Sequence, residues 1–321
     1  MNILYLVIPC YNEEEVLPET SKRLLAKMEH LIGQKKISPR SKIVFVNDGS
    51  KDNTWAQIEE LHRANPMYSG VCLSRNRGHQ NALLAGLLSV KDQADMTISL
   101  DADLQDDLDA IDQMVDKFHA GADVVYGVRD NRETDTRFKR FTAELYYRLI
   151  QKFGGDVVFN HADYRLLSRR ALAALAEYKE TALFLRGIIP MIGYQTEIVY
   201  YARGERFAGE SKYPLKKMLA LAIDGITGLS VRPLRMILST GIFLLLAALT
   251  IAVATLICHL STRSVCATDV RLILIAIFAV GGLNMVALGI VGEYAGKTYM
   301  EVKQRPRFFI DKVLHDDKQE G

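Results

Sequence analysis

Residues 96–105 of the chain read MTISLDADLQ, a mostly apolar run that ends in an Asp-Ala-Asp triplet. The run Met96–Leu100 is typical of a β-strand that is buried on both faces. Asp101 and Asp103 follow it directly, so both carboxylates stand where the strand ends. Carboxylate oxygens suit a divalent cation such as Mg²⁺ or Mn²⁺. In the alternative interpretation, these acids only favour the start of the next helix.

Strands and helices alternate on both sides of this stretch. Further strands are predicted at Ile3–Pro9, Lys42–Asn47, Gly70–Leu73, Ala122–Val128 and Tyr194–Tyr201. Helices are predicted at residues 13–32 (with Asn12 as the capping residue), Thr54–Ala64, Gly78–Lys91, Asp107–Ala120 and Phe138–Phe153. The alternation predicts an α/β fold with a doubly wound, mainly parallel sheet.

Polar residues follow several of the predicted strands. Ligands of such sheets bind beyond the carboxyl ends of the strands. We therefore expect one site that gathers Tyr11, Asn12, Glu13, Asp48, Asp101, Asp103, Gln105 and Arg129. Pro9, Tyr11 and Glu13 would form a wall beside a nucleobase, and Asp48 would bond to the base or the ribose. Alternatively, Asp48 only shapes the turn that Gly49 and Ser50 continue.

Two further groups of charged residues have both a structural and a functional interpretation. Asp163 and Arg165 are close enough in sequence to form a structural ion pair, while the functional interpretation places Asp163 near an acceptor. The glycine-bearing loop Gly204–Tyr213 contains Arg206 and Lys212. This loop would either close on an anionic substrate as a lid or remain a basic stretch beside acidic lipid.

The chain of 321 residues has a formal net charge of +2, which does not indicate a nucleic-acid partner. The 27 residues between Arg235 and Arg263, and the 21 between Arg271 and Glu293, contain no Asp, Glu, Lys or Arg. Roughly 20 apolar helical residues cross a bilayer. We therefore predict two transmembrane helices at about 236–260 and 272–292, with a pair of buried core helices as the alternative.

Basic residues flank the pair of predicted spans and predict its orientation. They are Lys212, Lys216, Lys217, Arg232 and Arg235 before it, and Lys297, Lys303, Arg305 and Arg307 after it. Such residues stay on the cytoplasmic side. We expect a catalytic domain at 1–210, an amphipathic juxtamembrane segment at 211–235, a transmembrane hairpin at 236–292 and a cytosolic tail at 293–321, which is polar and loose after Arg307. The protein would be a multi-pass protein of the inner membrane with both termini in the cytoplasm.

Several motifs in this order resemble those of the polyprenyl-phosphate glycosyltransferases in glycosyltransferase family 2, the group that includes dolichol-phosphate mannose synthase. They are IPCYNE (8–13), VNDGSKD (46–52), RNRGH (75–79), LDADLQD (100–106), GVR (127–129), ADYRLLSR (162–169), GESKY (209–213), LGIVGEY (288–294) and RPR (305–307). The two-span layout most resembles bacterial undecaprenyl-phosphate glucosyltransferases. The resemblance implies a GT-A fold and an inverting transfer of one sugar.

The resemblance also implies roles for individual residues. It assigns Pro9, Tyr11, Glu13 and Asp48 to the nucleotide, and Asp101, Asp103 and Gln105 to the metal and the diphosphate. It assigns Arg129, Arg140, Arg206, Ser211 and Lys212 to the donor and acceptor phosphates, with Lys139 as a substitute for Arg140. Asp101, Asp103, Asp163 and Arg129 would form the catalytic set, in which Asp163 orients a cation or the acceptor. The resemblance leaves the role of His79 open.

The function implied is transfer of a sugar from a nucleotide-sugar to undecaprenyl or another polyprenyl phosphate. UDP-glucose is the first choice of donor by resemblance, followed by UDP-N-acetylglucosamine, GDP-mannose and UDP-aminoarabinose derivatives. A flippase and a downstream glycosyltransferase would use the product, and a homo-oligomer is compatible with the sequence. A processive polysaccharide synthase is a weaker alternative, because the sole tryptophan, Trp55, lies far from any Gln-X-X-Arg-Trp motif. A catalytically silent membrane scaffold is the third interpretation.

Overall fold

The computed structural model describes residues 1–130, 161–180, 184–202, 234, 236–244 and 270–314, together with positions 204, 246, 250, 253 and 257. The helix predicted at Phe138–Phe153 and the juxtamembrane segment predicted at 211–235 lie outside these residues, apart from position 234.

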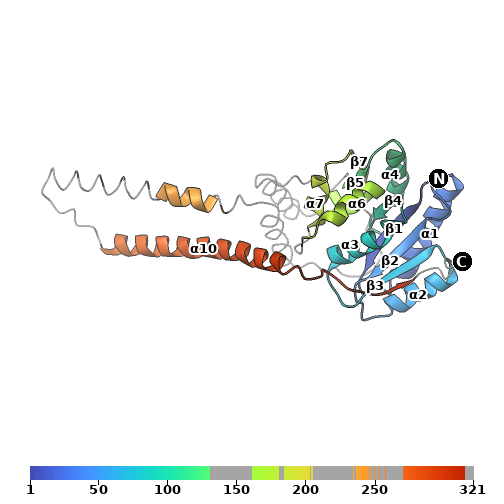
Figure 1. The fold of residues 1–321 in the computed structure, drawn as a ribbon, viewed down its shortest axis with the longest axis horizontal. Helices are drawn as coiled ribbons and strands as arrows, with labels where there is room; N and C mark the ends of the chain where they lie inside the picture. The colour runs from blue at the N-terminus through green and yellow to red at the C-terminus, as the bar shows by residue number, and fades with distance from the viewer. Residues whose placement is uncertain are drawn as a thin grey trace.

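The first hundred residues alternate between strand and helix, as predicted (Figure 1). The elements are β1 (Leu4–Cys10), α1 (Leu17–Gly33), β2 (Lys42–Asn47), α2 (Thr54–Ala64), β3 (Tyr68–Leu73), α3 (His79–Val90) and β4 (Met96–Ser99). Every residue of β1 is buried, which explains its unbroken apolar sequence. This strand lies between β2 and β4 and pairs with both in parallel, and β2 pairs with β3 in parallel.

The chain continues with α4 (Ala110–His119), β5 (Val124–Arg129), β6 (His161–Ser168), α6 (Arg169–Glu177), α7 (Leu185–Met191) and β7 (Thr196–Tyr201). The strand β6 lies between β4 and β5 and is antiparallel to both, while β7 is parallel to β5. The sequence pattern did not predict β6, α6 or α7. The strand β6 was not predicted because its charged residues, Asp163 and Arg165, interrupt the apolar pattern that is typical of a buried strand.

Helices cover both faces of the sheet, which confirms the doubly wound, mainly parallel arrangement of the GT-A type. One face packs against α1, α2 and α4 through residues such as Leu24, Ile58 and Ile111. The other packs against α3, α6 and α7 through residues such as Leu84, Leu172 and Ile188. The sheet order is β7-β5-β6-β4-β1-β2-β3, with one further strand at the β3 edge.

Two predicted helix starts were wrong. The helix α1 begins at Leu17, with Val16 at the capping position and a proline in its first turn. Asn12 does not cap the helix and has a left-handed backbone conformation with φ of 52°. The side chain of Asn12 accepts a hydrogen bond from the backbone N–H of Lys51 instead. The helix α4 begins at Ala110 rather than at Asp107. Asp107 therefore joins Asp101, Asp103 and Asp106 in the loop that precedes α4.

The C-terminal part leaves the sheet and then returns to it. The helix α10 (Val270–Val302) projects away from the sheet, and β8 (Ile310–Leu314) brings the chain back (Figure 1). The strand β8 pairs antiparallel with β3, and Ser69 Oγ donates a hydrogen bond to the carbonyl oxygen of Leu314 at 2.9 Å. The expectation of a loose tail was therefore wrong for Ile310–Leu314, because these residues cover an otherwise open sheet edge.

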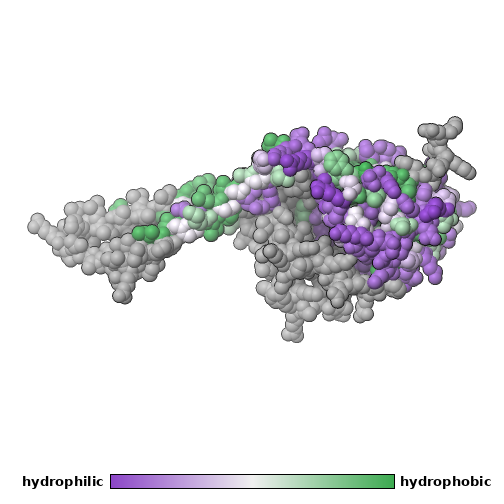
Figure 2. All heavy atoms as spheres, turned by 90° about the horizontal axis from the view of Figure 1, so that it is seen from below, coloured by the Kyte–Doolittle hydropathy of each residue, from purple (hydrophilic) through white to green (hydrophobic). Residues whose placement is uncertain are grey.

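Apolar side chains are exposed along α10. They include Leu283, Met285, Val286, Leu288 and Val291. Figure 2 shows apolar residues, in green, along the part of the molecule that projects from the sheet domain. Within the described ranges, no helix is at once long enough and apolar enough to cross a bilayer. The spans at about 236–260 and 272–292 remain a prediction.

Candidate active site

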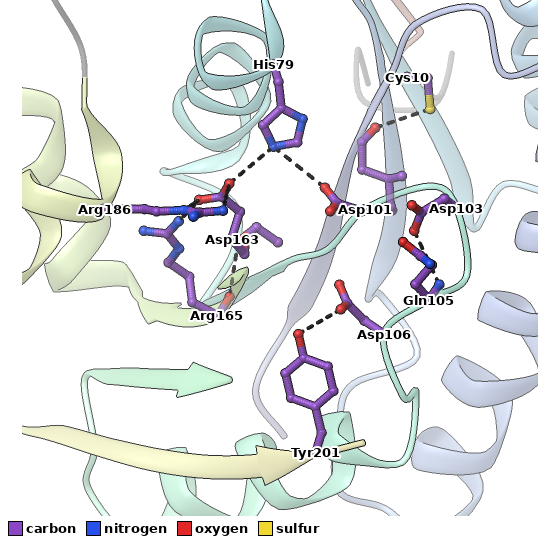
Figure 3. Close-up of polar contacts among 12 residues, drawn as sticks. Cys10, His79, Asp101, Asp103, Gln105, Asp106, Asp163, Arg165, Arg186 and Tyr201 are labelled. Carbon is purple, nitrogen blue, oxygen red and sulfur yellow. Dashed lines mark hydrogen bonds and ion pairs between the residues drawn. The ribbon is translucent and has the colours of Figure 1, made fainter. Parts of the chain in front are cut away.

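The carboxylate that follows β4 and a carboxylate on β6 both face the first residue of α3 (Figure 3). His79 Nε2 lies 3.6 Å from Asp101 Oδ1 and 3.6 Å from Asp163 Oδ2. Burial favours the neutral form of His79, but the neighbouring carboxylates of Asp163 and Asp101 together raise its pKa above the ordinary value. His79, whose role the resemblance left open, thus links Asp101 to a residue that is distant in sequence.

Asp163 is surrounded by cationic groups. Arg186 donates hydrogen bonds through Nε to Oδ1 at 3.2 Å and through Nη2 to Oδ2 at 3.0 Å, and Arg165 donates through Nη2 to Oδ1. Burial alone would raise the pKa of Asp163, but Arg186, His79 and Arg165 hold it well below its usual range. Asp163 is therefore an ionised carboxylate at neutral pH. The local pairing of Asp163 with Arg165 is confirmed.

The loop after Asp101 turns back on itself and contacts the segment that follows β7. Asp103 Oδ1 accepts a hydrogen bond from the backbone N–H of Gln105 at 3.2 Å, and Leu104 has a positive φ of 56°. The carbonyl oxygen of Gln105 accepts the N–H of Gly204 at 2.8 Å. Residue 204 opens the loop Gly204–Tyr213, so the start of this loop lies against the Asp-Ala-Asp segment.

A second polar network joins this loop to β5 and β7. Tyr201 Oη donates a hydrogen bond to Asp106 Oδ1 at 2.7 Å, and Arg129 Nε donates to Tyr201 Oη at 3.4 Å. Burial and the negative charges of Asp101 and Asp103 raise the pKa of Asp106 to about 6. Arg129, predicted to point toward the site, thus acts on the acidic loop through Tyr201.

Asp48 lies at the end of β2 and is only 2% exposed. Its Oδ1 accepts the backbone N–H of Arg77 at 2.6 Å, and its Oδ2 accepts that of Gly78 at 2.9 Å. Burial raises the pKa of Asp48, although these bonds and nearby His79 oppose the rise. The carboxylate thus holds the turn that presents His79, a contact that neither sequence interpretation included.

The remaining residues assigned to the nucleotide lie at the carboxyl end of β1. Pro9 is buried in the strand opposite Val46. Tyr11 and Glu13 are half-buried just beyond it, and the backbone N–H of Glu13 donates to Thr54 Oγ1 at 2.9 Å. All three share the sheet edge with Asp48, as predicted. Their contact with a nucleotide remains a prediction.

The acidic loop fits a hard divalent cation by its donor chemistry. Asp101 and Asp103 supply carboxylate oxygens and Gln105 an amide oxygen. In the described part of the chain, no group of three or more His, Cys, Asp or Glu residues could hold a metal by itself. Mg²⁺ is commonly bound by one or two carboxylates together with substrate phosphates. A site with two carboxylates is therefore compatible with a metal ion whose remaining ligands come from the substrate.

Four of the predicted phosphate-binding residues, Arg140, Arg206, Ser211 and Lys212, lie outside the described residues, as does the alternative Lys139. Conversely, sequence reasoning missed Asp106, Arg186 and Tyr201. A lone arginine in the apolar run Phe184–Ile189 was the available signal for Arg186, since a charge inside such a run requires a partner. No comparable sequence signal marks Tyr201.

Comparison with known sequences identifies relatives over nearly the whole chain. The family model described as glycosyl transferase family 2 matches residues 5–175. An uncharacterized glycosyltransferase of Bacillus subtilis, YkoT, is 46% identical over 98% of this chain and 93% of its own length. A protein of Escherichia coli described as a prophage bactoprenol glucosyl transferase homolog is 38% identical over 96% of this chain and 98% of its own length.

Among solved structures, glucosyl-3-phosphoglycerate synthase from Mycobacterium tuberculosis, in complex with Mn²⁺, UDP-glucose and phosphoglyceric acid, gives a TM-score of 0.47. The sequence identity is 18%, and the match covers 70% of this chain and 78% of the other.

Proposed function

We propose a function for this chain, which belongs to glycosyl transferase family 2 and is a glycosyltransferase. It moves one sugar from a nucleotide-sugar to a polyprenyl phosphate. UDP-glucose is the proposed donor and undecaprenyl phosphate the proposed acceptor. The relatives described as bactoprenol glucosyl transferases, which match at 36% to 38% identity over most of the chain, support this choice.

One observation supports the proposal most directly. The acidic loop, which contains Asp101, Asp103 and Asp106, lies beside a cationic cluster formed by Arg165 and Arg186 around Asp163, and His79 contacts both. Asp101 and Asp163 both approach this imidazole at Nε2, each at 3.6 Å. The acidic loop suits a cation-bound diphosphate, and the arginines around Asp163 suit a second anion. A transferase that joins an anionic donor to an anionic acceptor needs both kinds of subsite side by side.

The proposed chemistry is a direct displacement that inverts the anomeric carbon. An oxygen of the acceptor phosphate forms a bond to that carbon, and the bond to the nucleoside diphosphate breaks with its electron pair going to the departing phosphate. A phosphomonoester has a second pKa of about 6, so the acceptor is largely dianionic at neutral pH and needs no strong base. Asp163, whose pKa is well below its usual range, orients Arg186 in this scheme and accepts no proton.

Asp101, Asp103 and Gln105 would hold Mg²⁺ or Mn²⁺. When bound, the cation would neutralise charge that develops on the departing diphosphate. The protein's own part is to fix the loop: Tyr201 holds Asp106, and Arg129 holds Tyr201. These two hydrogen bonds keep the acidic residues in place before a substrate binds.

We further propose that the protein is a multi-pass protein of the inner membrane, with the catalytic domain and both termini in the cytoplasm. The exposed apolar side chains of α10 support contact with lipid. The basic residues that flank the apolar segments support the orientation. A flippase and a downstream glycosyltransferase would use the lipid-linked sugar, and oligomerisation would not alter the chemistry.

The test is transfer of radiolabelled sugar into lipid. The purified full chain, in detergent with Mg²⁺ or Mn²⁺, receives undecaprenyl phosphate and, in turn, labelled UDP-glucose, UDP-N-acetylglucosamine and GDP-mannose. We expect label in one organic-extractable product from UDP-glucose, and this label should be released by mild acid. A growing polymer would favour a processive synthase. Nucleotide binding without transfer from any donor would favour a scaffold and refute the proposal.

A further inference from the structure

Asp163 is one carboxylate that faces two guanidinium groups and an imidazole. Arg165, the inner guanidinium, has a side chain only 1% exposed, whereas the side chain of Arg186 is 32% exposed. Asp163 balances one of the two guanidinium charges. The next carboxylate, Asp101, lies 3.6 Å from His79 Nε2 and is the proposed ligand of the divalent cation, so with that cation bound one positive charge of the cluster is in surplus. This surplus lies in a half-buried environment, where it favours the binding of an anion.

The surplus charge lies beside Asp101 on the side opposite the rest of the acidic loop. Figure 3 shows Asp163, Arg165 and Arg186 on one side of Asp101, and Asp103 with Gln105 on the other. If the donor diphosphate lies over Asp103 and Gln105, an attacking group must approach from the opposite side of the anomeric carbon. The cationic cluster would then lie on that side, because Figure 3 shows it across Asp101 from Asp103 and Gln105.

Arg186 is the member of the cluster that a ligand can reach. Arg165 is enclosed on β6, and its Nη2 is turned toward Asp163. Arg186 lies on α7, and its Nε and Nη2 both donate to the carboxylate of Asp163 in a bidentate contact. A guanidinium held in this way is oriented before the ligand arrives, which lowers the entropic cost of binding.

We propose that Arg186 binds the phosphate of the acceptor lipid and that Asp163 and Arg165 are positioning residues for its guanidinium. The inference rests on the proposed function, since it names a residue for the acceptor subsite. It gives Asp163 a role in binding that needs no proton transfer.

The experiment measures donor and acceptor affinities separately in the full chain, with the variants Arg186→Gln and Arg186→Lys. Initial rates at saturating UDP-sugar give kcat and KM for geranyl phosphate, and calorimetry gives the Kd of UDP with Mn²⁺. We expect Arg186→Gln to raise KM for geranyl phosphate roughly 10- to 100-fold, as for loss of a hydrogen bond to a charged group. The Kd of UDP should stay within about twofold, and Arg186→Lys should be intermediate because it keeps the charge but loses the bidentate contact.

The matched control is Arg170→Gln. Arg170 makes a bidentate contact with Asp123 at the opposite end of β6, away from the acidic loop, and its loss should leave both constants unchanged. An unchanged KM for geranyl phosphate in Arg186→Gln would overturn the inference alone. An equal loss of UDP affinity would also overturn it, because it would indicate a general structural role. Absence of transfer by the wild-type chain from every donor would instead overturn the proposed function.

Discussion

Replacement of Asp163 by Asn should destabilise the protein far more than loss of an exposed ion pair. The side chains of Asp163 and Arg165 are 14% and 1% exposed, so the substitution leaves a buried guanidinium without its counter-charge. Removal of one partner of a buried pair costs about 3–5 kcal/mol. The whole stability of a domain is typically about 5–15 kcal/mol, so the loss is a large fraction of it.

The assay is urea unfolding of the full chain in detergent, followed by fluorescence. Trp55 is the sole tryptophan and packs from α2 against the core, so its emission reports on the sheet domain. The control is Glu197→Gln, which breaks a pair with Lys117 whose side chains are 44% and 35% exposed. That pair should contribute less than about 1 kcal/mol. If Asp163→Asn cost no more unfolding free energy than Glu197→Gln, the buried Asp163–Arg165 pair would not stabilise the fold.

The pH dependence provides a second check on Asp163. A carboxyl group whose folded pKa is below its unfolded value, about 3.9, contributes stability above that value and loses it as pH falls through the folded pKa. The difference in unfolding free energy between the wild type and Asp163→Asn should therefore narrow as pH falls below about 4. A difference that narrowed instead between pH 5 and pH 7 would contradict the lowered pKa.

Three further outcomes are expected. Asp103→Ala should abolish transfer that Mg²⁺ or Mn²⁺ supports and weaken UDP binding only when the metal is present; metal-independent binding in the wild type would contradict the metal site. Gly49→Ala should destabilise the domain by about 1–3 kcal/mol, measured by urea unfolding, because φ is +65° and a Cβ would lie 2.5 Å from the backbone nitrogen of Asn76. Truncation before Ile310 should expose the β3 edge and cause aggregation in light scattering, whereas truncation after Leu314 should not.

Local sequence was sufficient to predict an element wherever that element depends on an apolar pattern. The strand β2 and the helix α2 have the bounds that were predicted, because the KIVFVN run can only be buried and Thr54–Ala64 keeps the spacing of one helix face. It was insufficient where charge is buried. The strand β6 places Arg165 inside the sheet domain. No local sequence pattern predicts that this arginine is buried.

The residues after the sheet domain illustrate the same limit. Ile310–Leu314 reads as a polar tail because Asp311 and Lys312 interrupt it, yet it forms a strand. Pairing with β3 supplies the backbone hydrogen bonds that its own sequence does not encode. A short strand at a sheet edge depends on its neighbour more than on its own propensity.

By itself, the sequence determined the class of fold and the neighbourhood of the site, because strands of a parallel sheet that alternate with helices must deliver their carboxyl ends to one edge. It could therefore bring Asp48, Asp101 and Arg129 to the same edge. Only the tertiary structure decided which groups face each other across that edge. The position of His79 between Asp101 and Asp163, and of Arg186 beside Asp163, depends on how α3 and α7 pack over the sheet. Electrostatic contacts act over a few ångströms in space, and the packing of side chains sets those distances.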